Sequence, residues 1–405
     1  MAQKSLFGTT YSLESVANIN FDNFYIEGVD ATTGNVSAIS YKAKKITSCK
    51  LTNSTLKTAY IVASFVYKVD KEIANCSSDA TLMNGVGSIR TAGIVSGIAK
   101  DTIIENCSFH GKIKGHRCSA GIISDIPNRG LIINCENYGY ITGEQHTSGI
   151  AGTNTASGTR IINCKNYGEI FYLNYKQYEA AGILAYTSAG IDFVGCESYG
   201  EVYYSDSYAR GLILAECAPS SGEEPITINI INCKTKAMNN CPIITYPKTG
   251  NGGQRVVNYN IKNCEFSYEN KNQTQSILLF TYKSSGKIYF EGNVFINKSD
   301  KNTFKIIRGG LSGAETIFKD CMVYVQNDKF DLTTSALTNK EKIYGGIVIN
   351  VQNTPFAYYG SDFDGFYIDF KTGKIGLKAL SGKGFYQGKV SEGLVQSKGY
   401  TKKTI

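Results

Sequence analysis

Cys118, His146 and Glu179 hold equivalent places in three successive segments of the sequence, each three residues before a glycine. If the segments stack, a thiol, an imidazole and a carboxylate follow one another in the order nucleophile, base and orienting group. The same place holds Arg90 and Tyr208 in the flanking segments, but an insertion of five residues separates His146 from Glu179. That uneven spacing favours a solvated corner of ordinary surface residues. No catalytic residue is therefore predicted, and the stripe stays a hypothesis.

Metal and cofactor chemistry finds less support. His110 and His116 lie near Cys118 in the sequence and could hold an adventitious metal. A built metal site needs several ligands that converge on one ion, and no such set recurs along the chain. We therefore expect no metal and no cofactor.

Polysaccharide cleavage would need clustered carboxylates on one strand face. The position after a recurrent cysteine instead alternates in charge, because it holds Glu136, Lys165, Glu197, Lys234 and Glu265. Opposite charges one rung apart are typical of a surface ladder. The sequence therefore leans away from an enzyme; were the protein one, it would be a polysaccharide lyase or glycoside hydrolase.

The elements that would position these residues come from an internal repeat. The string Ile-Ile-Asn-Cys-x-Asn-Tyr-Gly-x-Ile surrounds both Cys135 and Cys164, which are 29 residues apart. Asparagine before a turn tolerates a left-handed backbone and can ladder its amide along a stack, and Asn293 stands where a further cysteine would be expected. The aligned column comprises Cys49, Cys76, Cys107, Cys135, Cys164, Cys196, Cys233, Cys264 and Cys321.

A second column of glycines, each followed by an apolar residue, lies between the cysteines and predicts a tight corner. It comprises Gly93, Gly121, Gly149, Gly182 and Gly211. The short apolar runs between turn residues lack a helical period, so they predict strands. Three short strands in about 29 residues predict one coil of a parallel β-helix; a leucine-rich repeat, the main competitor, would need denser leucine.

The predicted fold is all-β, with a single parallel β-helix of about 10–11 coils over residues 21–353. Residues 1–20 would form an N-terminal cap or arm. Residues 354–405 leave the period and predict a small C-terminal β appendage, with a hairpin around Thr372-Gly373-Lys374, for oligomerisation or docking.

The motif Gly-Ile-x-Gly followed by Ile-x-Asn-Cys-x-Asn-x-Gly-x-Ile resembles the GLUG-like arrays of right-handed parallel β-helix proteins. The resemblance covers Gly93 to Val202 well and the flanking coils loosely. Such arrays occur in bacterial and protist surface proteins, and β-helices of this kind form phage tailspikes. The resemblance implies the architecture and a right-handed winding; it implies almost nothing about activity.

Twelve cysteines raise the alternatives of a disulfide framework or a metal ladder. Nine of them in one column predict instead a buried, reduced stack, because parallel side chains on neighbouring rungs bridge only with strain. The N-terminus shows no apolar signal region, so we expect synthesis and folding in the cytoplasm and use elsewhere.

Composition limits the partners. The net charge of +8 is spread over 405 residues without a basic cluster, so nucleic-acid binding is not expected. No apolar stretch approaches a membrane span.

Tyrosines are the most suggestive surface residues, because exposed aromatic rows bind sugars or proteins with little loss of entropy. Stacking that only stabilises the coils is the alternative. The candidate binding residues are Tyr138, Tyr167, Tyr172, Tyr175, Tyr178, Tyr199, Tyr203, Tyr204 and Tyr208.

We therefore predict a non-enzymatic structural or adhesive protein, a phage or viral virion component such as a tail spike, fibre or capsid-surface protein. Its expected partners are further copies of itself, with a trimer among the options, other virion proteins, or a surface glycan. A cellular adhesin or scaffold is the alternative, and a polysaccharide lyase or hydrolase is the third interpretation.

Overall fold

The computed structural model divides the chain into two compact units, Met1–Ala218 and Pro219–Ile405, which we call unit 1 and unit 2. It describes residues 5–7, 12–28, 34–58, 60–85, 89–172, 179–203, 210–219, 224–237, 241, 243–245, 256–268, 275–279, 286–297, 304–308, 315–325, 342–351, 366–369, 376–379 and 385–387. Among these residues no helix is long and apolar enough to cross a membrane.

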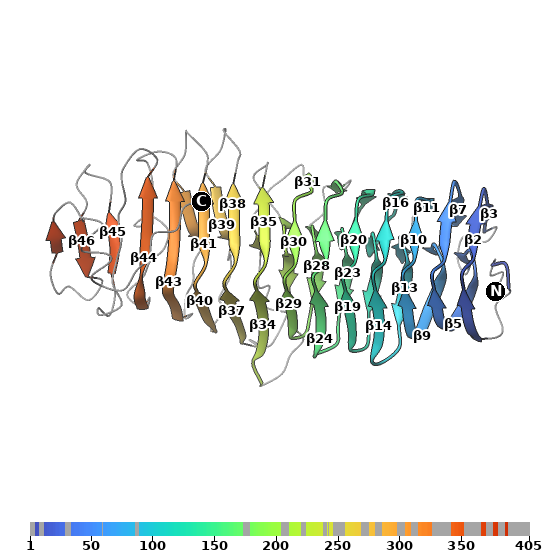
Figure 1. Cartoon of the computed structure of the whole chain (residues 1–405), viewed down its shortest axis with the longest axis horizontal. Helices are drawn as coiled ribbons and strands as arrows, with labels where there is room; N and C mark the ends of the chain where they lie inside the picture. Colours follow the sequence, from blue (N-terminus) through green and yellow to red (C-terminus); the bar gives the residue numbers. More distant parts are fainter. Residues whose placement is uncertain are drawn as a thin grey trace. The chain divides into compact units, whose positions relative to one another are not determined.

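Unit 1 is a β-solenoid in which the chain winds through the same walls once per coil (Figure 1). The strands that approach the cysteine position, which Ile19 occupies on the first coil, form the pre-cysteine wall. They are β1 (Ser12–Ala17), β5 (Ser40–Thr47), β9 (Val66–Ala74), β14 (Thr102–Glu105), β19 (Gly130–Ile133), β24 (Thr159–Ile162) and β29 (Ile191–Val194). The strands that follow it are β2 (Asn20–Asp22), β6 (Lys50–Thr52), β10 (Ser77–Ser78), β15 (Ser108–Phe109), β20 (Glu136–Asn137), β25 (Lys165–Asn166) and β30 (Glu197–Ser198).

Two seven-stranded sheets and a final set of strands complete each coil. The first sheet contains β3 (Tyr25–Glu27), β7 (Thr55–Thr58), β11 (Thr81–Asn84), β16 (Lys112–Lys114), β21 (Tyr140–Gly143), β26 (Ile170–Tyr172) and β31 (Val202–Tyr203). The second contains β4 (Asn35–Ser37), β8 (Ile61–Ala63), β12 (Arg90–Ala92), β17 (Ser119–Ala120), β22 (Thr147–Ser148), β27 (Ala180–Ala181) and β32 (Arg210–Gly211). The final set is β13 (Val95–Ile98), β18 (Ile123–Ile126), β23 (Ala151–Asn154), β28 (Leu184–Thr187) and β33 (Leu214–Cys217).

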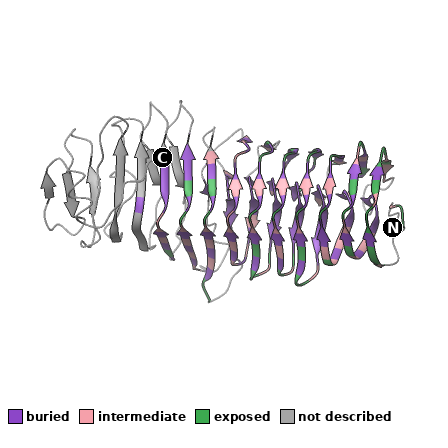
Figure 2. Ribbon diagram, in the orientation of Figure 1, coloured by how far each residue is buried: buried purple, intermediate pink, exposed green. Residues whose placement is uncertain are grey.

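Strands of successive coils pair in parallel, so each residue lies beside its counterpart one coil on. Ile104 pairs with Ile132, Ile132 with Ile161, and Ile161 with Phe193. All four side chains are buried, and Figure 2 shows buried residues through the coils of unit 1. The predicted parallel β-helix is therefore confirmed; its handedness stays a prediction.

The asparagine before the cysteine turns the chain, as the sequence predicted. Asn75, Asn106, Asn134 and Asn163 have φ between 51° and 56°. Their side chains also form a ladder, in which each Nδ2 donates to the Oδ1 of the preceding coil at 3.1, 3.2 and 3.3 Å. Asparagine suits this position because its short polar side chain tolerates the left-handed region.

The nine aligned cysteines form the predicted reduced column. They are free and buried, as are the other three, Cys118, Cys217 and Cys241. The Cys164 thiol donates to the carbonyls of Ile162 at 3.4 Å and Ile132 at 3.6 Å, so a small polar group is satisfied without water. In unit 2 the buried Asn293 takes the cysteine's place, as predicted, and its Oδ1 accepts the Cys264 backbone N–H at 2.9 Å.

The glycine column follows from close approach of the coils. A Cβ on Gly93 would lie 1.9 Å from the carbonyl oxygen of Gly121, and one on Gly149 would lie 2.3 Å from that of Gly182. The alignment predicted from the sequence fails by one residue at the last member, because Gly211 pairs with Ala181 and not with Gly182.

Unit 2 contains parallel strand pairs of its own and, near its C-terminal end, an antiparallel sheet. Its parallel pairs include β34 with β37 and β35 with β38. The predicted C-terminal hairpin is present, since β45 and β46 are antiparallel and β47 adds to β46. The strands of unit 2 are β34 (Ile226–Ile231), β35 (Lys234–Ala237), β36 (Ile244–Thr245), β37 (Val257–Lys262), β38 (Glu265–Tyr268), β39 (Gln275–Leu279), β40 (Lys287–Glu291), β41 (Val294–Asn297), β42 (Phe304–Arg308), β43 (Glu315–Val325), β44 (Lys342–Val351), β45 (Phe366–Asp369), β46 (Gly376–Ala379) and β47 (Phe385–Gln387).

Substitution of Asn134 tests the turn. Asn134→Ala loses both ladder bonds and strains the left-handed backbone, so we expect the free energy of unfolding to fall by about 1–2 kcal/mol. Asn134→Gly keeps the backbone unstrained and loses only the ladder, so it should cost about half as much. Urea denaturation measures both; an alanine variant as stable as wild type would contradict the ladder's role.

Candidate functional site

An aromatic ladder lies at the corner between the post-cysteine strands and the sheet of β16, β21 and β26. The local sequence Asn-Tyr-Gly builds it, because the glycine must sit against the coil below. A Cβ on Gly168 would lie 2.1 Å from the carbonyl oxygen of Gly139. Asn137 and Asn166 point inward, with the Asn137 Nδ2 donating to the Asn166 Oδ1 at 2.7 Å. In each coil the tyrosine between the inward asparagine and the tightly packed glycine, Tyr138 or Tyr167, therefore faces outward.

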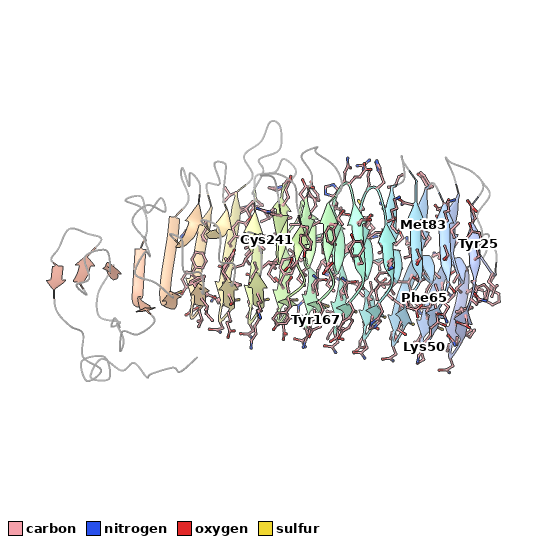
Figure 3. The ribbon with its side chains drawn as sticks, turned by 90° about the horizontal axis from the view of Figure 1, so that it is seen from above. Tyr25, Lys50, Phe65, Met83, Tyr167 and Cys241 are labelled. Atoms are coloured by element: carbon pink, nitrogen blue, oxygen red, sulfur yellow. The ribbon has the colours of Figure 1, made fainter. Side chains whose placement is uncertain are left out.

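The ladder consists of His110, Tyr138, Tyr167 and Tyr199 on four successive coils. Ring centroids are 4.7, 4.9 and 5.6 Å apart, and the interplanar angles are 6°, 13° and 23°. Tyr138 is 45% exposed and Tyr167 is 38% exposed. Tyr167 is labelled in Figure 3. The predicted tyrosine row therefore forms a continuous surface stack, which His110 extends by one rung.

A second aromatic stack begins two residues further along the chain. It consists of Tyr140, Phe171 and Tyr203, with ring centroids 4.8 and 4.2 Å apart. The sequence had singled out Tyr203 but missed Tyr140 and Phe171. Phe171 pairs in register with Thr142, so the Tyr140–Phe171 contact is diagonal and a simple column alignment does not reveal it.

Carboxylates hold three of the phenol groups in the two stacks, those of Tyr138, Tyr199 and Tyr203. The Tyr138 hydroxyl donates to Glu136 Oε2, and the Tyr199 hydroxyl donates to Glu197 Oε2, each at 2.8 Å. The bond to Glu136 is the main cause that raises the pKa of Tyr138 to about 12. A bond to Glu201 likewise raises the pKa of Tyr203 to about 12. These phenols stay protonated at neutral pH and are fixed in orientation.

The alternating charges beside the ladder also stack as predicted in unit 1. Glu136 pairs with Lys165 and Lys165 with Glu197, and the Lys165 Nζ lies 3.6 Å from Glu197 Oε1. The aromatic ladder is therefore flanked by both negative and positive side chains.

Stacking decides which parts of the rings a ligand can reach. A ring between two neighbours has both faces covered, so Tyr138 and Tyr167 offer ring edges and phenol oxygens. Such a surface suits an extended ligand that follows several rungs. The Tyr172 side chain and the whole of Tyr175, Tyr178, Tyr204 and Tyr208 lie outside the described residues, so their predicted role stays a prediction.

The hypothetical catalytic stripe lies at another corner, which we call the polar corner. The strand register places Cys118, His146 and Glu179 on successive coils. His146 Nδ1 lies 2.6 Å from Glu179 Oε2, and the His146 ring lies 4.9 Å from that of Tyr186. Cys118 and His146 have φ of 40° and 42°, a region that non-glycine residues seldom occupy. The base and the orienting group therefore meet as hypothesised.

The cysteine of the stripe faces different partners. Cys118 is 8% exposed and lies near Asp125 and Thr153. Burial first, and then the Asp125 charge, raise its pKa to about 12. A nucleophilic cysteine needs a lowered pKa, so this environment suits an inert thiol.

Sequence reasoning named Glu179 but missed the other two carboxylates of this corner, Asp125 and Glu216. Asp125 is 6% exposed; its carboxylate contacts Arg90 Nη2 at 2.5 Å and accepts a hydrogen bond from Thr153 Oγ1 at 2.5 Å. Glu179 is 2% exposed and Glu216 is 5% exposed. No signal in the sequence pointed to Asp125, because the equivalent positions on the next two coils hold Thr153 and Tyr186 and the charge does not recur.

Comparisons of the chain with protein-family models, with curated proteins and with solved structures found no match. Within the part of the chain that the structure describes, no group of three or more His, Cys, Asp or Glu side chains is arranged to hold a metal ion.

Thiol reactivity tests the polar corner. With its pKa raised to about 12, Cys118 should resist iodoacetamide at pH 8 and react only after unfolding. The raised pKa also means that the folded state disfavours the thiolate, so this thiol's stabilising contribution is present below about pH 9 and is lost towards pH 12. Mass spectrometry of alkylated peptides measures the labelling. Rapid native labelling of Cys118 that His146→Ala abolishes would restore the nucleophile hypothesis.

Proposed function

We propose that this protein is a non-enzymatic structural and adhesive β-helix protein that binds its target through the aromatic ladder. The observation that carries the proposal is the exposed stack of Tyr138 and Tyr167, continued by His110 and Tyr199. Fixed rings lose little conformational entropy on binding, and rows of them suit sugars or protein surfaces.

We further propose that it serves as a phage or viral virion component, such as a tail spike, fibre or capsid-surface protein, and contacts a surface glycan or another virion protein. Twelve free, buried cysteines support folding in a reducing compartment such as the cytosol. The alternative is a cellular surface adhesin or scaffold. Phage or chromosomal neighbours of the gene distinguish the two.

Removal of the two exposed rings tests the proposed contact. We expect Tyr138→Ala combined with Tyr167→Ala to weaken binding roughly tenfold to hundredfold, at about 0.7–1.4 kcal/mol for each ring. The measurement is a glycan array of host-surface polysaccharides, followed by titration of the strongest binder and of isolated virions.

Tyr25→Ala is the matched control. Tyr25 is 65% exposed and bonds to Glu27, as Tyr138 bonds to Glu136, but it lies on the first coil (Figure 3). Unchanged binding in the double variant, or equal loss in Tyr25→Ala, would exclude the ladder as the contact.

The buried carboxylates of the polar corner are the observation that favours the third interpretation, a polysaccharide lyase or hydrolase. Burying a charge is costly unless it is paired, and such groups concentrate at functional sites. Our proposal expects no loss of viscosity in a polysaccharide screen. A loss that vanishes in both Asp125→Asn and Glu179→Gln would favour the enzyme instead.

A further inference from the structure

The outer face of the pre-cysteine wall carries a column with an ordered pattern of charge. Register begins this column with Ser15, which pairs with Lys45. Six residues on the following coils continue it, and we call these six the first column: Lys45, Glu72, Ile103, Leu131, Arg160 and Asp192. In order, the column reads positive, negative, apolar, apolar, positive, negative. At a rung spacing of about 4.8 Å it extends about 24 Å.

A second column lies beside it, two residues further along each strand. It consists of Thr47, Ala74, Glu105, Ile133, Ile162 and Val194. Ile103 is 37% exposed, and Leu131, Ile133, Ile162 and Val194 are partly exposed. The core of the same strands is filled by their inward neighbours, such as Ile132. These aliphatic side chains therefore form a patch on the outside of a flat wall, which marks an interaction surface.

The ends of the patch carry ion pairs within the chain. Lys45 Nζ lies 2.9 Å from Glu72 Oε2, and Arg160 Nε lies 3.8 Å from Asp192 Oδ2. Arg160 and Asp192 are 53% and 38% exposed, so their charges are available to a further partner.

From this pattern we propose that the outer face of the pre-cysteine wall binds the same face of a second copy, with the two solenoids antiparallel. Consider a two-fold axis that lies in the plane of the face and runs parallel to the strands, perpendicular to the stacking direction. The axis passes midway between Ile103 and Leu131. It places Glu72 opposite Arg160 of the second copy and Lys45 opposite its Asp192. Ile103 faces Leu131 of the second copy, so the apolar centres of the two columns meet. Each of the six residues of the first column therefore faces a residue of opposite charge or another apolar residue.

A neighbouring column has the same symmetry. Asp101 and Arg129 precede β14 and β19, and Arg129 Nε lies 2.6 Å from Asp101 Oδ1. The same axis places Asp101 opposite Arg129 of the second copy, so four charges alternate at the centre of the interface. A two-fold contact requires this reciprocity, in which each residue meets the partner that its counterpart meets.

A parallel arrangement fits worse. A two-fold axis along the stacking direction that runs between the two columns would place the first column against the second, so Arg160 would face Ile162 and Glu72 would face Ala74. Arg160, Asp192 and Glu72 would then all be buried against apolar groups without a partner, which is unfavourable. An axis that runs over the first column would instead set each charge against its own copy. The antiparallel arrangement leaves only Glu105 opposite an apolar side chain, that of Ile133. The chemistry of the face therefore fits one occupant, a second copy in the antiparallel orientation.

Charge exchange tests the orientation while it keeps the fold. Arg160→Glu with Asp192→Arg preserves an ion pair within the chain but sets like charges opposite Glu72 and Lys45 of the second copy. Adding Lys45→Glu and Glu72→Lys restores every contact in the antiparallel dimer. We expect the double variant to raise the dissociation constant of the dimer roughly a hundredfold, and the quadruple variant to return it to near the wild-type value.

Sedimentation velocity of the full chain at roughly 1–200 µM measures the association. The control exchanges an ion pair elsewhere, Glu27→Lys with Lys57→Glu, whose Nζ and Oε1 lie 2.9 Å apart; it should leave the dimer unchanged. Circular dichroism checks that each variant is folded. A monomeric wild type, or a quadruple variant as dissociated as the double variant, would overturn the proposal.

Cross-linking provides a second readout that does not depend on charge. Glu72→Cys chains mixed with Arg160→Cys chains should form a disulfide-linked dimer on oxidation, since these positions face each other. Each variant alone should not, because like positions lie about 14 Å apart along the stack. Equal cross-linking by Glu72→Cys alone would exclude the antiparallel register. The aromatic ladder lies on a different part of each coil, so failure here leaves the proposed function standing.

Discussion

Stacking of each coil in register on the last is the constraint on which the rest of unit 1 depends. In a parallel solenoid a residue's principal neighbour is its own counterpart one coil away, at about 4.8 Å. Every column must therefore be compatible with itself. Asparagines share amide bonds, cysteine thiols reach backbone carbonyls of two coils, and glycines permit contact that a Cβ would block. Charged columns avoid repulsion by alternating in sign, so Lys45 pairs with Glu72 and Arg160 pairs with Asp192.

The same constraint shapes what the surface can bind. Stacked tyrosines cover one another's ring faces, so their stabilising contact and their proposed recognition role compete for the same surface. What remains outside is a line of edges, with phenols fixed by Glu136 and Glu197. Alternating charges behave similarly: they are satisfied within the chain, yet their order along the wall is open to a second copy that runs the other way. Repetition thus favours extended partners over compact ligands.

The polar corner departs from self-compatible stacking. Unlike side chains follow one another there, and their contacts run diagonally, as from Arg90 to Asp125 and from His146 to Tyr186. Burial of Asp125 and Glu179 is costly unless each is well paired, and a solenoid could fill these places with small residues. The positive φ of Cys118 and His146 adds local strain. This combination makes the corner the part of unit 1 that its architecture alone does not explain.

The sequence by itself determined the periodic features, because each of them needs only a residue type and a spacing. Asparagine before cysteine predicted the left-handed turn, and Asn293 was placed correctly in the cysteine column. The tyrosine row of Tyr138 and Tyr167 was predicted for the same reason. Only the tertiary structure decided the diagonal and between-wall contacts: the Tyr140–Phe171 stack, the Asp125 ion pair and the one-residue shift at Gly211. These depend on how insertions are absorbed at corners and on which way a side chain leans, and spacing along the chain specifies neither.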